Sequence, residues 1–192
     1  FEHASLLMAR KTMNNWLLFE SEGLLAFGLF LPEFRDAPRW RTEAISRFNN
    51  EITNQVFPDG VQRELSTSYH NGTIATFMGA WAMAATNGLG NEFPPAYTNL
   101  VVRMMRATLA WSLPDRSLPQ FGDSWRGGPM TNLFNSWQRL FPGAGLDVGV
   151  GAPPPLGFPT AYALSNGGFY TMRSGWDTNA IMLVLKCGPD GG

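Results

Sequence analysis

Apolar residues recur at helical spacing through the first 141 residues of the chain. After Tyr69, for example, Ile74, Phe77 and Trp81 follow one another at intervals of three and four residues, which places them on one face of a helix. Prolines and glycine-containing turns separate this stretch from others of the same kind. The pattern predicts five helices, over about 13–30, 36–54, 69–86, 94–113 and 130–141.

The hydrophobic period changes towards the C-terminus. Between Pro142 and Pro159 the chain holds five glycines, five prolines and a single charged residue, as a linker or long surface loop does. Beyond it, side chains at 169–174 alternate with a period of two, and 180–185 is a continuous apolar run. These patterns predict two strands joined by a turn at 176–179.

Together these elements predict a mainly α chain. Helices joined by short turns pack as antiparallel hairpins side by side, as in toroids and solenoids, and the sequence has no strict repeat of the solenoid kind. We therefore expect antiparallel helical hairpins stacked side by side at 1–141, a Gly/Pro-rich linker at 142–167 and the first strands of an antiparallel β domain at 168–192. Because two strands alone are not stable, we expect that domain to continue past Gly192.

Composition narrows the function classes. Lys and Arg total 14 against 15 Asp and Glu, whereas an unselective nucleic-acid binder is far more basic, so no nucleic-acid partner is expected. Apolar residues make up 44% of the chain, which excludes global disorder. The longest apolar stretch, Leu24–Leu31, is too short for the bilayer, which needs about 20 residues, so no membrane insertion is expected.

Residues that usually ligate metals are scarce. Cys187 is the only cysteine, which rules out a disulfide framework within the chain and a cysteine-based zinc cluster. The two histidines, His3 and His70, belong to no His-x-x-x-His or acidic cluster. We assign no metal ligand and expect no cofactor within this chain.

Two helix starts carry unusual polar residues. Asn14 and Asn15 precede Trp16 at the head of a very apolar helix, and Tyr69 and His70 follow a Ser-Thr-Ser run at the head of another. Asn, Ser and Thr often cap helices, so capping is one interpretation of both starts. A role in binding or catalysis is the other.

These helix starts belong to an ordered set of motifs that resembles the heparinase II/III-like family of polysaccharide lyases, and most of all its heparan-sulfate lyases. The set runs in the family's order from about residue 10 to residue 192, and it is more specific for the family than for a substrate. The motifs are Asn15-Trp16, Pro58-Asp59-Gly60, Glu64-Leu65-Ser66, Tyr69-His70, Phe121-Gly-Asp-Ser124, Gly168–Trp176 and Leu185–Pro189.

The resemblance implies that the helical hairpins form an incomplete (α/α) toroid followed by an antiparallel β-sandwich, in a bacterial protein that is periplasmic or secreted. It implies that the partner is an acidic polysaccharide, heparan sulfate or heparin, cleaved by β-elimination to unsaturated uronate products. In the family, the residue that maps to Asn15 hydrogen-bonds the uronate carboxylate, and the residue that maps to Tyr69 transfers a proton. A catalytic His of the β-sandwich is expected beyond Gly192, as is any metal ion of that domain.

The chemistry needs these residue types. A lyase removes the weakly acidic C5 proton of a uronate and expels the 4-linked oxygen. A neutral amide such as Asn15 can stabilise the charge that develops on the carboxylate, and a phenol such as Tyr69 can give or take a proton. The candidate substrate-binding residues next to these motifs are Trp16, Arg63, Glu64, His70, Trp125 and Arg126.

Several alternatives stay open at this level. The enzyme could cleave alginate or another uronate polymer, or the chain could be a helical carbohydrate-binding protein without catalysis. Trp16 and Trp125 could be packed in the core, and Arg63 and Arg126 could be ordinary surface charge. For His70, a role in supporting Tyr69 is favoured over a catalytic one.

Overall fold

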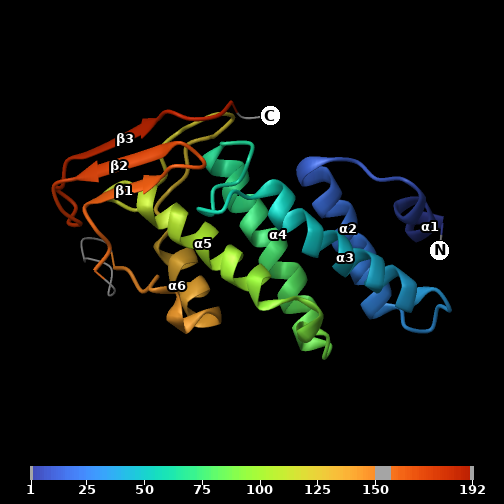
Figure 1. The fold of residues 1–192 in the computed structure, drawn as a ribbon. Helices are drawn as coiled ribbons and strands as arrows, with labels where there is room; N and C mark the ends of the chain where they lie inside the picture. The colour runs from blue at the N-terminus through green and yellow to red at the C-terminus, as the bar shows by residue number, and fades with distance from the viewer. Residues whose placement is uncertain (1, 150–156, 191–192) are drawn as a thin grey trace. The chain divides into compact units, whose positions relative to one another are not determined.

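The computed structural model describes residues 2–149 and 157–190, with helices followed by strands (Figure 1). This order confirms the predicted fold class, mainly helical with antiparallel strands after the helices. In chain order the elements are α1 (Glu2–Ala9), α2 (Asn14–Phe30), α3 (Ala37–Gln55), α4 (Thr67–Thr86), η1 (Gly90–Glu92), α5 (Pro95–Trp111), α6 (Thr131–Leu140), η2 (Pro142–Ala144), β1 (Ala161–Leu164), β2 (Phe169–Arg173) and β3 (Met182–Lys186).

The five predicted helices are α2 to α6, and α1 is an addition to them. Its eight residues are too few to show a clear period, and a contact from α3 supports its end. There the buried Arg47 donates from Nη2 to the Leu7 carbonyl oxygen at 2.9 Å. Carbonyls in the last turn of a helix lack a helical partner, so this bond stabilises the end of α1.

Residue contacts divide the chain into two compact units. The first holds 1–55 and 72–101, and the second holds 56–71 and 102–192. Helices α4 and α5 each supply residues to both units. The predicted domain boundaries at 141 and 168 follow a different criterion, the change of hydrophobic period, and stay predictions.

In the first unit, α2 and α3 pack directly on each other. Gly28 lies at their contact, where a Cβ atom would come within 2.6 Å of the Arg41 backbone nitrogen. Only glycine allows the two backbones to approach this closely. Elsewhere in the unit, Phe48 meets Phe77 edge-on with ring centres 6.2 Å apart, and Phe77 meets Tyr97 at 5.8 Å. These buried rings connect α3, α4 and α5.

In the second unit, the three strands form one antiparallel sheet in the order β1-β2-β3. Strands β2 and β3 correspond to the two predicted strands. Strand β1 falls inside the segment expected to be an irregular linker, since four residues are too few to show an alternation. The turn after β1 is held by Asp59, whose Oδ2 accepts hydrogen bonds from the backbone nitrogens of Asn166 (2.7 Å) and Gly167 (2.9 Å).

Arg173 fastens β2 to the end of α5. Its Nη2 donates to the carbonyl oxygens of Ala110 (2.7 Å) and Ser112 (3.1 Å), where the helix leaves its carbonyls without helical partners. Its guanidinium lies 3.6 Å from the ring centre of Trp176. Burial, together with the nearby charge of Arg116, lowers the pKa of Arg173 to about 10. The group therefore stays charged at neutral pH while it joins strand to helix.

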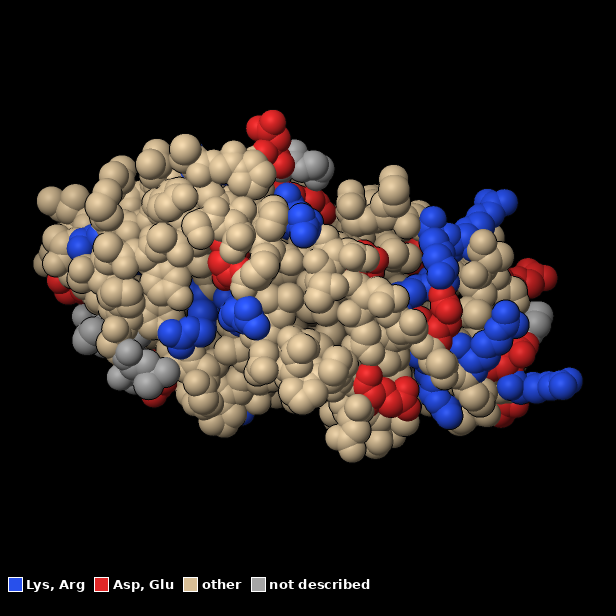
Figure 2. Space-filling view, viewed as in Figure 1, with Lys and Arg blue, Asp and Glu red and all other residues tan. Residues whose placement is uncertain are grey.

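Charges of both signs share the surface of the first unit. On the face drawn in Figure 2, basic and acidic side chains are interspersed over α1, α2 and α3. In this unit Glu43 Oε1 lies 2.7 Å from Lys11 Nζ and 2.9 Å from Arg47 Nε. In the described ranges, every helix is too short or too polar to cross a membrane.

Candidate active site

The site is built around the first turn of α4, where Ser66 caps the helix. The Tyr69 backbone nitrogen donates to Ser66 Oγ at 3.3 Å, and the His70 nitrogen donates to the Ser66 carbonyl oxygen at 2.9 Å. The side chain thus satisfies one of the amide groups that a helix start leaves without a partner. This confirms the capping interpretation for the serine run and sets Tyr69 three residues into the helix.

Ser124 ties a distant loop to this first turn. Its Oγ accepts a hydrogen bond from the Ser68 nitrogen at 3.2 Å and lies 2.9 Å from Thr67 Oγ1 and 3.0 Å from Ser66 Oγ. Ser68 Oγ in turn accepts a hydrogen bond from the Trp125 nitrogen at 3.2 Å. The loop and the helix start therefore hold each other through reciprocal bonds. The motif residues around Ser124 position Tyr69 in this way.

His70 supports the same turn from inside the protein. Its Nδ1 accepts a hydrogen bond from the Gln62 nitrogen at 3.2 Å, so Nε2 carries the proton and donates to the Met104 carbonyl oxygen at 3.0 Å. The ring is buried against Trp111, and burial lowers its pKa to about 4. A side chain so placed has no surface to offer a polysaccharide. The structure therefore corrects the prediction of substrate contact and gives His70 a positioning role.

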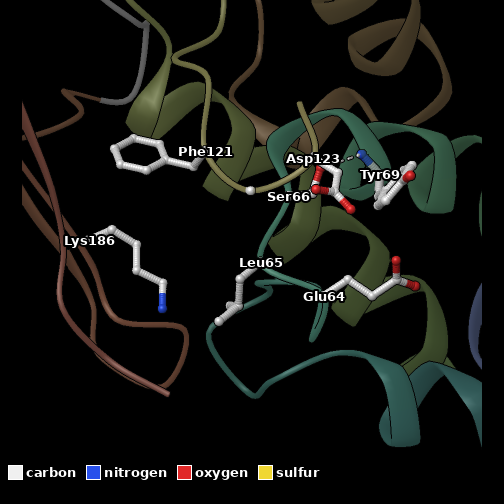
Figure 3. Close-up of a pocket in the computed structure, with 8 residues that line it drawn as sticks. Glu64, Leu65, Ser66, Tyr69, Phe121, Asp123 and Lys186 are labelled. Carbon is white, nitrogen blue, oxygen red and sulfur yellow. Dashed lines mark hydrogen bonds between the residues drawn. The ribbon is translucent and has the colours of Figure 1, made fainter. Parts of the chain in front are cut away.

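A pocket of about 420 Å³ opens beside Tyr69 (Figure 3). Two residues of its wall have a left-handed backbone conformation, since φ is 57° at Leu65 and 58° at Gly122. A bulky side chain with positive φ costs energy, and such strain is concentrated at functional sites. The lining residues come from the loop before α4, from α4, from the loop of Ser124 and from β3; they are Glu64, Leu65, Ser66, Tyr69, Phe121, Gly122, Asp123 and Lys186.

Aromatic and acidic candidates gather at this pocket. Tyr69 is half-buried, and its ring meets that of Trp125 edge-on at 6.3 Å. Trp125 is 64% exposed, which contradicts the core-packing alternative for this residue. Glu64 lines the pocket, and its Oε1 accepts a hydrogen bond from Gln62 Nε2 at 3.1 Å.

The two predicted arginines lie outside the pocket lining. Arg63 is exposed, and its guanidinium carbon sits 4.4 Å from the ring centre of Phe57. Arg126 is also exposed. Hydrogen bonds from Ser117 lower the pKa of Asp115, and the charge of Arg126 adds a smaller contribution. The cation that does line the pocket is Lys186, which sequence reasoning did not select because it stands at the end of an otherwise apolar strand.

Asn15 and Trp16 belong to the first unit, at the start of α2. The N-cap residue there is Met13, with no side-chain capping bond, so the capping interpretation is wrong for Asn15. Asn14 has a φ of 55°, a left-handed conformation that Asn tolerates better than most residues, and Gln55 Nε2 donates to its carbonyl oxygen at 2.8 Å. Trp16 is 70% exposed, again contrary to core packing.

The structure brings Tyr69, Glu64 and Trp125 together with Lys186 in one unit. Asn15 and Trp16 lie in the other unit, and the catalytic roles that the resemblance implies for Asn15 and Tyr69 stay predictions. For cofactors, no group of three His, Cys, Asp or Glu side chains converges as a metal site would require, in the ranges 2–149 and 157–190. The expectation of no cofactor within this chain likewise stays an expectation.

Comparison with known proteins identifies the family. The family model described as "Heparinase II/III N-terminus" matches residues 1–145. The chain belongs to this family. It is 43% identical over 185 residues to a heparin-sulfate lyase of Pedobacter heparinus, covering 92% of this chain and 28% of that protein. A heparin-sulfate lyase of Bacteroides stercoris is 34% identical over 181 residues, covering 91% and 27%.

Solved structures show the same fold. The heparan sulfate lyase HepC of Pedobacter heparinus matches with a TM-score of 0.80 and 41% identity, over 98% of this chain and 30% of that chain. A heparinase III structure matches with a TM-score of 0.87 and 23% identity, over 98% and 32%. These matches confirm the resemblance found in the sequence and the fold class expected from it. The chain spans less than a third of the length of the curated relatives it matches.

Proposed function

We propose that the protein containing this chain is a polysaccharide lyase that cleaves heparan sulfate by β-elimination. The observation that carries the proposal is the setting of Tyr69. Its phenol stands in a capped and clamped helix turn, at the wall of an open pocket and beside an exposed tryptophan. A sugar ring can stack on such a tryptophan while a fixed phenol reaches its oxygen atoms. The relatives that bear the name heparin-sulfate lyase support the same activity.

In the proposed reaction a base takes the C5 proton of a uronate. The C4–O bond breaks, a C4–C5 double bond forms, and the leaving oxygen receives a proton. Tyr69 is the proton-transfer group, and it needs no movement because its backbone is already held by Ser66 and Ser124. Positioning of this kind is a large part of the catalytic advantage of a general acid or base.

Asn15 is proposed to bind the uronate carboxylate through its side-chain amide. Negative charge builds on that carboxylate as the C5 proton leaves, and a neutral donor placed there stabilises the developing charge. Asn15 is half-buried at the start of α2 and is not used as the helix cap, so its amide is available for a ligand. Heparan sulfate as substrate, the catalytic His outside this chain and a periplasmic or secreted location belong to the same proposal.

The test is incubation of the full-length protein with heparan sulfate, alginate and hyaluronan, followed by the ultraviolet absorbance of unsaturated uronates. We expect absorbance to rise with heparan sulfate. A rise with alginate alone would reassign the substrate within the family, and binding without any rise would favour a carbohydrate-binding protein. Tyr170→Phe is the matched control for tyrosine substitutions, because it removes a hydroxyl from β2 at a position that does not line the pocket.

A further inference from the structure

Strand β3 carries its charge on the less exposed side. Along this strand Leu183 and Leu185 are exposed, whereas Met182, Val184 and Lys186 are half-buried. On this less exposed side, Lys186 brings its ammonium group to the pocket that contains Tyr69.

Among the described residues, Lys186 has a hydrogen-bond acceptor but no carboxylate within ion-pair distance. Its Nζ donates to the carbonyl oxygen of Pro189, which orients the side chain. Within the described residues the only carboxylate in an ion pair is Glu43, which lies in the first unit and binds Lys11 and Arg47. A half-buried ammonium that faces a pocket and pairs with no described carboxylate has charge left to offer a ligand.

The rest of the pocket defines where that ligand charge can lie. Among its lining residues Lys186 is the one cation, and Glu64 and Asp123 are acidic. Figure 3 shows Lys186 on one side of the pocket, with Glu64, Asp123 and Tyr69 towards the other. An anionic group is attracted to the side of Lys186 and repelled from the carboxylates, which favour hydroxyl or amide donors instead.

We infer that Lys186 is a substrate-binding residue that holds an anionic oxygen, carboxylate or sulfate, of the acidic sugar bound against Tyr69. The inference rests on the proposed function and adds an orientation to it. The sugar's anionic edge lies towards β3, and its hydroxyl groups lie towards Glu64 and Asp123. Lys186 contributes affinity and alignment, while proton transfer stays with Tyr69.

The test measures binding in the full-length protein carrying Tyr69→Phe, so that the ligand is not consumed. Two probes are titrated, a heparan sulfate octasaccharide and an unsulfated glucuronate–N-acetylglucosamine octasaccharide. We expect Lys186→Met to raise Kd about tenfold, since a hydrogen bond to a charged group is lost, and Lys186→Arg to restore most of the affinity. Loss with both probes assigns the carboxylate as the bound group, and loss with the sulfated probe alone assigns a sulfate.

The chain provides a matched control, because Lys11 is its only other lysine and pairs with Glu43 in the first unit. Lys11→Met should bind both probes like the parent. A folded Lys186→Met protein with unchanged Kd for both probes would overturn the inference. If Lys186→Met melts early, Lys186→Gln and Lys186→Arg are compared at equal melting temperature, and equal affinities would overturn it as well. Failure of the parent enzyme to form unsaturated uronate would instead end the lyase proposal and leave the binding result standing.

Discussion

The two helix starts that carry the predicted catalytic residues are built in different ways. At α4, Ser66 caps the helix and Ser124 joins a loop to the first turn. At α2, the N-cap residue makes no side-chain bond, and the turn begins with Asn14 in a left-handed conformation. One start is a hydrogen-bonded assembly, and the other is a strained turn.

The difference separates two uses of polar residues at a helix start. In α4 the serines bind the backbone, and the residue with chemical capability, Tyr69, is left to face the pocket. In α2 the backbone is held from outside, by Gln55 donating to the Asn14 carbonyl oxygen, and the Asn15 side chain is not used for capping. In both arrangements the predicted catalytic side chain does not cap its helix. Mutations of Tyr69 or Asn15 should therefore change turnover more than stability, and mutations of the capping and supporting residues should change stability more than turnover.

The largest expected effect is on turnover, from Tyr69→Phe. The substitution keeps the ring and its contact with Trp125 and removes only the hydroxyl. If Tyr69 transfers the proton, kcat should fall roughly 10²–10⁴-fold while KM changes little. Initial elimination rates and the melting temperature are measured together. A variant that melts early and turns over at the parental rate would make Tyr69 a structural residue only.

Asn15→Ala should also act on turnover rather than on stability. The amide stabilises charge that develops during the reaction, so kcat should fall by roughly 10²–10³-fold. The melting temperature should hold because Asn15 does not cap α2. Its neighbour is the control: Asn14→Ala places alanine at a φ of 55° and should cost about 1 kcal/mol of stability with kcat nearly kept. Equal stability losses for both variants would contradict the distinction.

Acid should weaken the start of α4 through His70. Its pKa is about 4 in the folded protein against an ordinary 6.5, so the unfolded chain binds more protons between these values. The contribution of neutral His70 to the free energy of unfolding is therefore complete above pH 6.5. It is lost as the pH falls towards 4, which lowers the free energy of unfolding by about 3 kcal/mol between these two pH values. Denaturant unfolding at several pH values measures it. His70→Gln should flatten the dependence, and an unchanged slope in that variant would assign it to other groups.

Ser124→Ala should have the smallest effect, and it should lower both the free energy of unfolding and kcat. The backbone N–H of Ser68 loses its acceptor, whereas the Thr67 hydroxyl keeps the Pro119 carbonyl oxygen at 2.7 Å, so the free energy of unfolding should fall by roughly 1 kcal/mol. Because Tyr69 is then less well fixed, kcat should fall modestly. Ser136→Ala, which removes only a local bond to the Leu133 carbonyl within α6, should change neither by much. Chemical denaturation and initial elimination rates of the two variants test whether Ser124 affects both stability and turnover.

Helices and strands were predictable from the sequence wherever the hydrophobic period extends over enough residues to be recognised. Helices α2 to α6 and strands β2 and β3 carry such patterns, whereas the eight residues of α1 and the four of β1 do not. The capping role of the serine run before Tyr69 was also predictable, because a cap is a local bond between residues three apart. These features depend on neighbours in the chain.

The rest of the site depends on residues far apart in the chain. Ser124 meets Ser68 across 56 residues, and no local pattern encodes such a partner. Burial of His70 and exposure of Trp125 are equally set by tertiary packing. Lys186 was missed for the same reason, since only the fold shows which side of β3 meets the pocket.

The hydrogen bonds from Arg173 to the end of α5 have a consequence for folding during synthesis of the chain. Its two carbonyl acceptors, Ala110 and Ser112, are synthesised 63 and 61 residues before the guanidinium that binds them. At about 5–20 residues per second, a ribosome needs on the order of 3–12 s to cover that distance. Throughout this interval the last turn of α5 in a nascent chain lacks its capping arginine. Assembly of the second unit around that turn is therefore completed only after β2 has emerged.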